Sequence, residues 1–460
     1  MDKKQNKSPS PPSPPLNNRA FFRFQPPLQP KPPIMTEGEN EMLNKLQGFE
    51  YIPQEEIGKS ICRHCLNDLT HAGWCGGCEQ REFVRNWQKW DSGSPEVNSI
   101  IEDTQFKTKN MFTFLEWIPP KKIYRIPGIV GTGGTGIVTA ALWMDGPRKS
   151  VQRECNPRSG PTNVALKAFK NQKYFIKELT AIKQWLLHFN EFAEEDFERA
   201  LKYVIRCYGV TFNPTTSSYE LVFQLVKDGT LREYLDTKWT LLSWPEKLRL
   251  TKDLALALQL FHKRNLVHGD LHSGNILMNN NVPVIIDLAQ CRTAESSKSE
   301  RPPFGLVPYV APEVWCRAPY TTAADIYSFA VIMFELATGC RPFGGTAHGA
   351  NLRHAVIQGK RPTIAYGSGI PNRYVDLIYN NWGHDPEKRH TVDQILIDIC
   401  RWYGALLKKN DFEIMEDFYK AESRRVKMLA DSEQTLLHIL GGHPQATYTS
   451  RLLDDTTLRR

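Results

Sequence analysis

The sequence contains no long run of apolar residues. No stretch approaches the roughly 18 continuous apolar residues that a membrane-spanning helix requires. The first residues are basic, but serines and prolines follow them where a secretory signal peptide would have an apolar core. We therefore expect neither a membrane span nor a signal peptide, and we predict a cytoplasmic location with the nucleus as the alternative.

The sequence also lacks a basic stripe interleaved with aromatic residues, the pattern that is typical of nucleic-acid binding. The 460-residue chain has a formal net charge of +8, but residues 1–36 contain six bases and one acid. Five of the eight positive charges therefore lie in that segment, and the rest of the chain is close to balanced. We expect no nucleic-acid partner.

The same N-terminal segment is poor in residues that could form a core. Residues 1–36 contain ten prolines, and such a composition favours a disordered chain with polyproline II character. We predict a disordered, basic tail over residues 1–37. It is interpreted as a spacer, with a docking site for a proline-binding partner as the alternative.

Cysteine is scarce and unevenly placed. Of the 10 cysteines, six are scattered singly, a pattern that favours a reduced compartment over a disulfide framework. The other four form two Cys-x-x-Cys pairs: Cys62, Cys65, Cys75 and Cys78. Two such pairs can supply the four thiolates of a closed, structural zinc site, which leaves no position for substrate. We predict a small zinc-binding segment over residues 38–92, with Gly73, Gly76 and Gly77 in its tight turns. This segment could bind partners, which the sequence does not identify.

Two helices are expected after the cysteines. Residues 82–90 are apolar at helical spacing, and their aromatic side chains are interpreted as core against the zinc segment. Ser94 and Pro95 then form a typical helix start, followed by the apolar stripe Val97, Ile100 and Ile101. We predict a helical linker over residues 93–119.

A glycine-rich stretch follows between two short apolar runs. Gly131, Gly133 and Gly136 form a Gly-x-Gly-x-x-Gly pattern, with Val138 two residues later. Dinucleotide-binding folds use the same pattern, but there the glycines open a helix, whereas here a strand continues. A strand–loop–strand hairpin of this kind lays backbone amides over phosphate groups.

A lysine and a glutamate follow at a spacing that suits an ion pair. Lys167 ends the strand Asn163-Val164-Ala165-Leu166-Lys167, from which its side chain can reach nucleotide phosphates. A helix is expected over about 173–189, and Glu178 on it is the predicted partner of Lys167. Glu191 is the alternative partner.

The stretch from His268 to Leu277 contains the candidate catalytic residues. Asp270 is followed five residues later by Asn275, and a second apolar run delivers Asp287. Three such oxygen-bearing side chains can accept a hydroxyl proton and hold magnesium. On its own, this Asp–Asn pair could equally be an ordinary turn.

Downstream motifs give these residues a family resemblance. Ala311-Pro312-Glu313 resembles the end of an activation segment. Asp325 resembles the aspartate that braces the catalytic loop, and Arg389 resembles the arginine that pairs with the glutamate of that segment, here Glu313. Residues of about 123–403 therefore resemble a eukaryotic protein kinase domain. The resemblance implies an α+β fold with two lobes, a small antiparallel β-rich lobe and a helical lobe, preceded by the zinc segment.

The resemblance also implies ATP and Mg²⁺ as cofactors and assigns roles to the site residues. Asp270 would be the catalytic base, assisted by His272, Lys167 and Glu178, and Asn275 and Asp287 would hold magnesium. The residues expected to bind the nucleotide are Val130, Gly131, Gly133, Gly136, Val138, Ala165, Lys167, Phe223, Gln224, Val226 and Leu277.

A closer resemblance is to tyrosine-kinase-like kinases, and especially to the expanded family of mycorrhizal fungi. Members of that family are similar in the four-cysteine segment, in a Trp-Ile-Pro entry to the domain and in the tail motif Tyr448-Thr449-Ser450-Arg451-Leu452-Leu453. We predict the kinase domain over residues 120–403 and a helical or irregular C-terminal extension over residues 404–460.

Three positions depart from the usual kinase pattern. Gly269 replaces the arginine before the catalytic aspartate, His272 replaces the lysine two residues after it, and Asp287-Leu288-Ala289 replaces Asp-Phe-Gly. A neutral imidazole stabilises a migrating phosphoryl group less than an ammonium does, but it can still donate a hydrogen bond. Control by phosphorylation of the activation loop is in doubt without the arginine.

The predicted function is phosphoryl transfer from ATP to a protein substrate. Serine and threonine are favoured as acceptors because the catalytic loop lacks the Ala/Arg pattern of tyrosine kinases. A pseudokinase that binds ATP as a scaffold is the first alternative. A small-molecule kinase is the second, although such kinases lack the pair formed here by Glu313 and Arg389.

Overall fold

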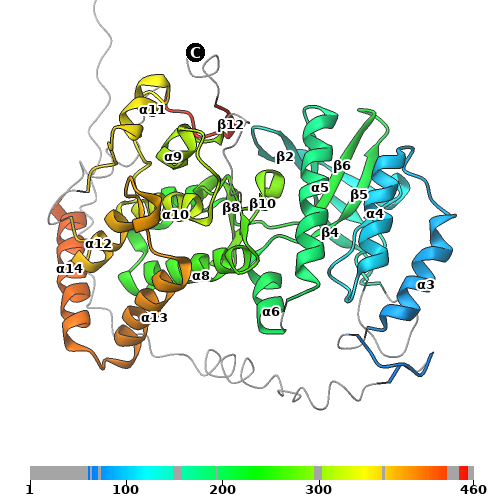
Figure 1. Cartoon of the computed structure of the whole chain (residues 1–460), viewed down its shortest axis with the longest axis horizontal. Coiled ribbons are helices and arrows are strands. Elements are labelled where there is room, and N and C mark those ends of the chain that lie inside the picture. The colour runs from blue at the N-terminus through cyan, green and yellow to red at the C-terminus, as the bar shows by residue number, and fades with distance from the viewer. Residues whose placement is uncertain are drawn as a thin grey trace, which may run out of the picture. The chain divides into compact units, whose positions relative to one another are not determined.

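A six-stranded sheet forms the N-terminal part of the fold (Figure 1), in the order β1-β5-β6-β4-β3-β2. All neighbours in it are antiparallel except β1, which is parallel to β5. The computed structural model describes residues 61–62, 65–70, 74–148, 158–192, 194–294, 303–364, 368–431 and 445–453. The tail predicted over residues 1–37 lies outside them. The strands are β1 (Glu116–Trp117), β2 (Ile123–Thr132), β3 (Gly136–Trp143), β4 (Thr162–Phe169), β5 (Cys207–Asn213) and β6 (Ser218–Gln224).

Helix α5 (Gln172–Phe189) lies against this sheet, close to the predicted range of 173–189. Asn171 caps its first turn, since its side chain accepts the Tyr174 N–H. The buried face of α5 includes Phe175, Leu179 and Ile182, which share one core with β5 and β6. This packing fixes the position of Glu178 on the same helix.

Helix α4 (Pro95–Lys107) packs on α5 and begins as the sequence predicted. Ser94 is the N-cap and accepts the Val97 N–H, and proline occupies the first turn. Val97, Ile100 and Ile101 are buried against α5. The predicted linker is not helical throughout, however, because β1 lies within residues 93–119 and joins the sheet.

Helix α3 (Gly76–Trp87) corrects the predicted boundaries of 82–90. It begins immediately after Cys75, so Gly76 and Gly77 lie in its first turn rather than in a separate tight turn. Gly73 lies outside the described residues. A Cβ on Gly76 would lie 3.2 Å from Thr70, which shows how closely the cysteine loop packs on this helix. Trp74, Phe83 and Phe114 form the small core beneath it.

The C-terminal part of the fold is mainly helical. A capping box of Ser243 and Glu246 starts α8, and α10 is buried around most of its circumference. The α-helices are α6 (Glu194–Tyr203), α7 (Leu231–Lys238), α8 (Trp244–His262), α9 (Pro312–Trp315), α10 (Thr322–Thr338), α11 (Ala350–Ile357), α12 (Asn372–Asn381), α13 (Val392–Lys408) and α14 (Phe412–Asp431). Because α13 runs to Lys408, the domain end predicted at residue 403 falls inside a helix.

Short strands and single helical turns connect these helices and build the site. The strand pairs are β7 (Leu266–Val267) with β10 (Arg292–Thr293), β8 (Ile276–Asn279) with β9 (Val282–Ile285), and β11 (Phe304–Gly305) with β12 (Arg451–Leu452). The 3-10 turns are η1 (Pro120–Lys122), η2 (Trp239–Leu241), η3 (Ser273–Asn275), η4 (Leu288–Gln290), η5 (Val307–Tyr309) and η6 (Pro386–Lys388). The pairing of β11 with β12 joins residues 451–452 to the segment that follows Asp287.

The predicted fold class is confirmed: a β-rich part is followed by a helical part in an α+β arrangement. In the part of the chain that the structure describes, no helix combines the length and apolar character needed to cross a membrane.

Candidate active site

The loop between β7 and β8 contains Asp270, and Asp325 of α10 binds the backbone of this loop. The Asp325 carboxylate accepts the N–H groups of His268 at 2.7 Å and of Gly269 at 3.0 Å. Asp325 is buried, and its pKa lies below its ordinary value because hydrogen bonds and nearby histidines outweigh the effect of burial. A charged aspartate therefore fixes the backbone of the loop, as the sequence motif predicted.

Gly269 stands where most kinases have arginine, and its backbone explains the choice of residue. Its φ is +75°, a left-handed conformation that glycine adopts without strain. A Cβ here would lie 3.0 Å from the Gln290 carbonyl oxygen and 3.2 Å from the Arg292 guanidinium. The side chain of Arg292 thus occupies the space beside the position from which arginine is missing.

Asp270 and Asn275 are paired, as expected for more than an ordinary turn. The Asn275 amide donates to the Asp270 backbone carbonyl at 2.9 Å and to its carboxylate at 3.2 Å. Burial, with the charge of Asp287 as the second cause, holds the pKa of Asp270 well above its ordinary value. A carboxylate with a raised pKa is a better proton acceptor once it is ionised.

Lys167, Glu178 and Asp287 form a second group. The Lys167 ammonium lies 2.8 and 2.6 Å from the two Glu178 oxygens and 3.2 Å from Asp287 Oδ2. Burial lowers the pKa of Lys167, but the carboxylates of Asp287 and Glu178 outweigh it and hold that pKa above its ordinary value. The structure thus brings Lys167 to Glu178 and not to the alternative Glu191, which is exposed.

The segment Asp287-Leu288-Ala289 adopts a conformation that does not require glycine at its third position. The positive φ of 61° falls on Asp287, whereas Ala289 lies in the helical turn η4. Leu288 is buried in the main core, so it fills the apolar position that phenylalanine usually occupies. Asp287 consequently faces Lys167 despite the altered motif.

The glycine-rich hairpin joins β2 and β3, as predicted, and the Gly133 N–H donates to the Gly136 carbonyl at 2.9 Å. Gly136 is required for packing, because a Cβ there would lie 1.9 Å from the Ala168 carbonyl oxygen. In contrast, a Cβ on Gly131 or Gly133 would meet nothing within 4 Å among the described residues. The backbone at these two glycines borders open space, as a phosphate-binding hairpin needs.

The remaining residues predicted to bind the nucleotide lie on adjoining strands. Val138 pairs with Lys167, and Ala165 pairs with Phe223, in the registers of β3–β4 and β4–β6. Val226 forms a small apolar cluster against which Phe223 and Leu277 pack. Val130 stays exposed on β2, and Gln224 ends β6 with its N–H bonded to the Arg206 carbonyl.

His272 lies beside Asp270, with Nε2 3.7 Å from Asp270 Oδ1. Burial lowers the pKa of His272 to about 3, so the imidazole is neutral. Its Nδ1 accepts the Gly274 N–H at 3.1 Å, which assigns the proton of the neutral ring to Nε2. That Nε2–H lies 2.7 Å from Ser450 Oγ, a contact that sequence reasoning missed.

The ion pair predicted between Arg389 and Glu313 is confirmed. Both guanidinium nitrogens lie 2.7 Å from the Glu313 carboxylate oxygens, and Arg389 also donates to the Ala323 carbonyl. This pair joins α9 to the residue that follows η6, and the bond to Ala323 adds α10 to the same contact.

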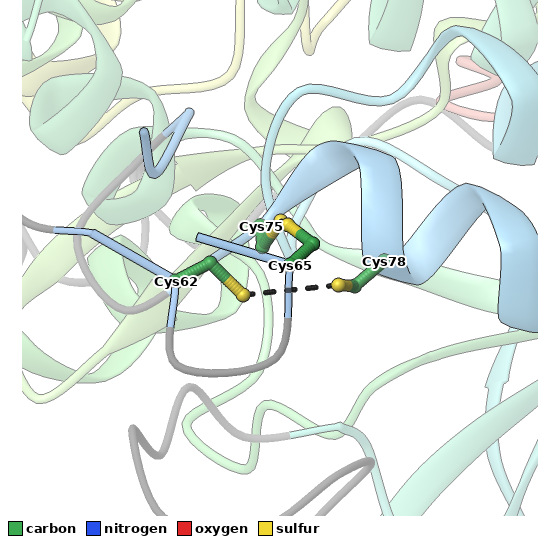
Figure 2. A group of neighbouring side chains, drawn as sticks. All are labelled: Cys62, Cys65, Cys75 and Cys78. Carbon is green, nitrogen blue, oxygen red and sulfur yellow. Dashed lines mark hydrogen bonds between the residues drawn. The ribbon is translucent and has the colours of Figure 1, made fainter. Parts of the chain in front are cut away.

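The four clustered cysteines point their sulfurs toward one another (Figure 2). All four Sγ atoms lie within 4.8 Å of each other, with Cys62–Cys78 at 3.7 Å and Cys65–Cys75 at 3.4 Å. Tetrahedral zinc with bonds of about 2.3 Å requires a sulfur–sulfur separation of about 3.8 Å. The donor set and its spacing therefore fit zinc.

Comparison with known proteins agrees with this geometry. The family described as protein tyrosine and serine/threonine kinase matches residues 126–399. Cyclic GMP-binding protein C of Dictyostelium discoideum is 28% identical over 286 residues, which are 58% of this chain and 10% of that protein. A probable serine/threonine-protein kinase of the same organism is 30% identical over 199 residues, 42% of this chain and 14% of that protein.

A third relative comes from a plant. Serine/threonine/tyrosine-protein kinase HT1 of Arabidopsis thaliana is 28% identical over 201 residues, 42% of this chain and 47% of that protein. The chain thus spans 10% and 14% of the first two relatives and about half of the third. Because the family match covers more than half of the chain, the chain belongs to the protein tyrosine and serine/threonine kinase family.

Proposed function

We propose that the protein is an ATP-dependent protein kinase that transfers the γ-phosphate to a serine or threonine of a protein substrate. The observation that carries this proposal is the arrangement of two groups. Lys167, Glu178 and Asp287 form one connected set, and Asp270 and Asn275 form the other. Phosphoryl transfer needs such positioning and charge stabilisation more than covalent chemistry.

Each residue has a proposed role. Asp270 accepts the proton of the substrate hydroxyl, and Lys167, oriented by Glu178, binds the α- and β-phosphates. The amide oxygen of Asn275 and the carboxylate of Asp287 are hard oxygen donors that suit Mg²⁺, which when bound neutralises charge on the phosphates. The glycine hairpin covers the phosphates with backbone N–H groups. The adenine ring is enclosed by apolar side chains: Ala165, Val138, Phe223, Val226 and Leu277.

His272 is proposed to take a reduced form of the role that lysine has in serine/threonine kinases. Its Nε2–H points at the position of an acceptor hydroxyl, next to Asp270. A neutral donor can orient that hydroxyl, but it stabilises less negative charge than an ammonium. We therefore expect a slow enzyme rather than an inactive one, and the intact ion pairs do not favour the pseudokinase alternative.

We also propose membership of the tyrosine-kinase-like group, with the expanded family of mycorrhizal fungi as the nearest resemblance. The features that support it are the cysteine segment, the altered catalytic loop and the tail motif. The Glu313–Arg389 pair supports a protein kinase rather than a small-molecule kinase. The cytoplasmic location and partners for the proline-rich tail and the zinc segment stay predictions.

The cysteine cluster is proposed to hold one structural Zn²⁺. Cys62 and Cys75 are buried and Cys65 and Cys78 half-buried, and none is in a disulfide. Four thiolates fill a tetrahedral shell and leave no open position for chemistry. The metal would fix the loop that leads into α3.

The test is phosphate incorporation into a general protein substrate by the purified full chain with radiolabelled ATP and magnesium. We expect incorporation by the natural protein and its loss in Asp270→Asn, while ATP still raises the thermal stability of that variant. Asp376→Asn, an exposed change on α12, is the matched control and should leave the rate unchanged. Incorporation that persists in Asp270→Asn would refute the assignment.

A further inference from the structure

Residues 445–453 lie beside a small cavity lined by Asp270, Phe304 and Tyr309, and we call this surface the groove. Strand β12 pairs antiparallel with β11, with Leu452 opposite Phe304 and Arg451 opposite Gly305. The Leu453 N–H extends this pairing with a bond of 2.8 Å to the Pro303 carbonyl. An extended peptide held by main-chain hydrogen bonds is a general mode of peptide recognition.

Side chains hold the same segment, residues 445–453, in place. Leu453 is 2% exposed and belongs to the main core. The Tyr448 hydroxyl donates to the Pro342 carbonyl at 3.0 Å, and its ring lies against His348 and Arg341. The Arg451 guanidinium donates to the His348 carbonyl at 3.0 Å. The segment therefore has a defined register in the groove.

This register places Ser450 at the catalytic aspartate. The His272 Nε2–H donates to Ser450 Oγ at 2.7 Å, and the same Nε2 lies 3.7 Å from Asp270 Oδ1, so the serine hydroxyl lies beside the Asp270 carboxylate. The serine oxygen thus sits between a hydrogen-bond donor and a proton acceptor. A hydroxyl that is held beside a carboxylate can attack phosphorus while its proton passes to that carboxylate.

The glycine hairpin closes over the same residue. A Cβ on Gly134 would lie 1.9 Å from the Ser450 carbonyl oxygen, so only glycine permits this approach. Gly134 is the glycine of the hairpin that the nucleotide pattern does not require. Its close contact with Ser450 brings the phosphate-binding loop and the serine to the same place.

The two residues before Ser450 also carry hydroxyl groups, and their side chains make other contacts. The Tyr448 hydroxyl is bonded to Pro342, and the Thr449 methyl group points toward Gly134, 3.5 Å from its Cβ position. Among the described tail residues, Ser450 is the one whose hydroxyl bonds to His272, beside Asp270.

We propose that Ser450 is a phosphorylation site which the kinase modifies in cis. This inference rests on the proposed function. Ser450 Oγ forms a bond to the γ-phosphorus of ATP, the bond from that phosphorus to the β–γ bridging oxygen breaks, and the proton passes to Asp270. The products are phosphoserine and ADP, so the step needs no reactant beyond ATP.

The modification would also control access to the groove. Before transfer, residues 445–453 cover Asp270 and compete with any other substrate. After transfer, the phosphoserine carries a charge of about −1.5 to −2 next to the carboxylates of Asp270 and Asp287. Repulsion between these anions then drives the tail out and opens the groove.

The experiment follows phosphate on the tail in the full chain. Phosphatase-treated protein receives ATP and magnesium, and mass spectrometry measures the occupancy of Ser450 over time at widely different protein concentrations. We expect Ser450 to be phosphorylated at a rate that does not depend on protein concentration. Ser450→Ala should lose the phosphopeptide, whereas Thr449→Val, which keeps the methyl group at Gly134, should retain it.

A mixing experiment separates cis from trans. Tagged Asp270→Asn protein, which keeps Ser450, is incubated with active Ser450→Ala protein. We expect no phosphate on the tagged chain, and transfer to its Ser450 would overturn the cis assignment.

Activity on a separate protein substrate distinguishes the two proposals. If that substrate is phosphorylated while Ser450 stays unmodified, the inference about Ser450 is wrong and the proposed function stands. If neither is phosphorylated, the proposed function fails, and the inference fails with it. If both are phosphorylated, the rate on the added substrate should rise severalfold as Ser450 becomes occupied, and a constant rate would refute control of the groove by the tail.

Discussion

The cysteine-containing segment before the kinase domain and the tail after it both pack on that domain, but by different means. The first reaches α5 through α4, whose Val97 and Ile101 are fully buried in the core that holds α5. The second is held by main-chain hydrogen bonds, by side-chain hydrogen bonds of Tyr448 and Arg451, and by the buried side chain of Leu453. The first contact resembles the interior of a domain, and the second resembles a bound peptide.

Polar contacts show the same difference. On the N-terminal side, buried Arg148 pairs with Glu79 of α3 at 2.6 Å and stacks on Phe83, and Asn190 accepts a hydrogen bond from Thr113 at 2.5 Å. On the tail side, the central contact is a serine hydroxyl between His272 and Asp270. We infer that the N-terminal segment is a permanent support of α5, whereas the tail is an exchangeable occupant of the groove.

Loss of a zinc ligand should have the largest effect on this comparison. Cys75→Ser removes a thiolate at the start of α3, and structural zinc contributes about 10–16 kcal/mol to the folding of zinc-finger peptides. We expect loss of one zinc per chain and loss of hydrogen-exchange protection over residues 74–92. Cys316→Ser, at an exposed cysteine outside the cluster, is the control. Unchanged zinc content in Cys75→Ser would contradict the site.

Breaking the ion pair on α5 should have the next largest effect. Removing one partner of a buried pair costs about 3–5 kcal/mol, and Glu178→Gln leaves Lys167 without its nearest counter-charge. Loss of orientation should lower kcat/KM about 10–100-fold. Glu191→Gln is the matched control because Glu191 is exposed and near the end of the same helix. An equal loss in both variants would mean that Glu178 has no special role.

Weakening the contact between α4 and α5 should have the third largest effect. Ile101→Ala removes a fully buried side chain, which costs about 2–4 kcal/mol. We expect a lower free energy of unfolding and faster hydrogen exchange in α5. Phe106→Ala changes a residue of α4 that is 58% exposed and should do neither. If Ile101→Ala leaves exchange in α5 unchanged, α4 does not support that helix.

Much of the site could be predicted because its residues belong to short motifs. The spacing from Asp270 to Asn275 and the order of the later motifs predicted the catalytic loop. The two Cys-x-x-Cys pairs predicted the metal cluster. Local capping signals at Ser94 gave the correct start of α4. The resemblance to protein kinases, which these motifs established, then predicted the fold class and contacts between distant residues such as that of Arg389 with Glu313.

Three features could not be predicted, and two of them depend on contacts between distant residues. Ser450 is separated from His272 by 178 positions, and the tail motif contains no pattern that indicates which surface it binds. Strand β1 has two residues and gains its conformation from pairing with β5. Helix α3 begins at glycines that sequence reasoning assigned to turns, and Thr70 of the cysteine loop packs against the first of them, Gly76.

Weakening the binding of the tail should have a smaller effect, and it should raise the rate on an added substrate, which Glu178→Gln lowers. Leu453→Ala removes the buried anchor of the tail at a cost of about 2 kcal/mol, roughly 30-fold in the docking equilibrium. The initial rate on an added protein substrate should rise, while phosphorylation of Ser450 should slow. Both are measured with unphosphorylated protein. Leu407→Ala, at a leucine of α13 that is 62% exposed, is the control. A fall in both rates would show that Leu453 supports the fold of the kinase domain instead.

The smallest effect is expected from the tyrosine of the tail. Tyr448→Phe keeps the ring against His348 but removes the hydrogen bond to the Pro342 carbonyl, which is worth about 1 kcal/mol or roughly fivefold in docking. The initial rate on an added substrate should rise less than in Leu453→Ala, and Tyr419→Phe, on the exposed face of α14, should change nothing. Because the Tyr448 hydroxyl is far from the transferred phosphate, kcat on that substrate should equal that of the natural protein once Ser450 is fully phosphorylated. A difference that persists after Ser450 is phosphorylated would mean that the tail stays bound, and the contrast between a permanent N-terminal support and an exchangeable tail would then be wrong.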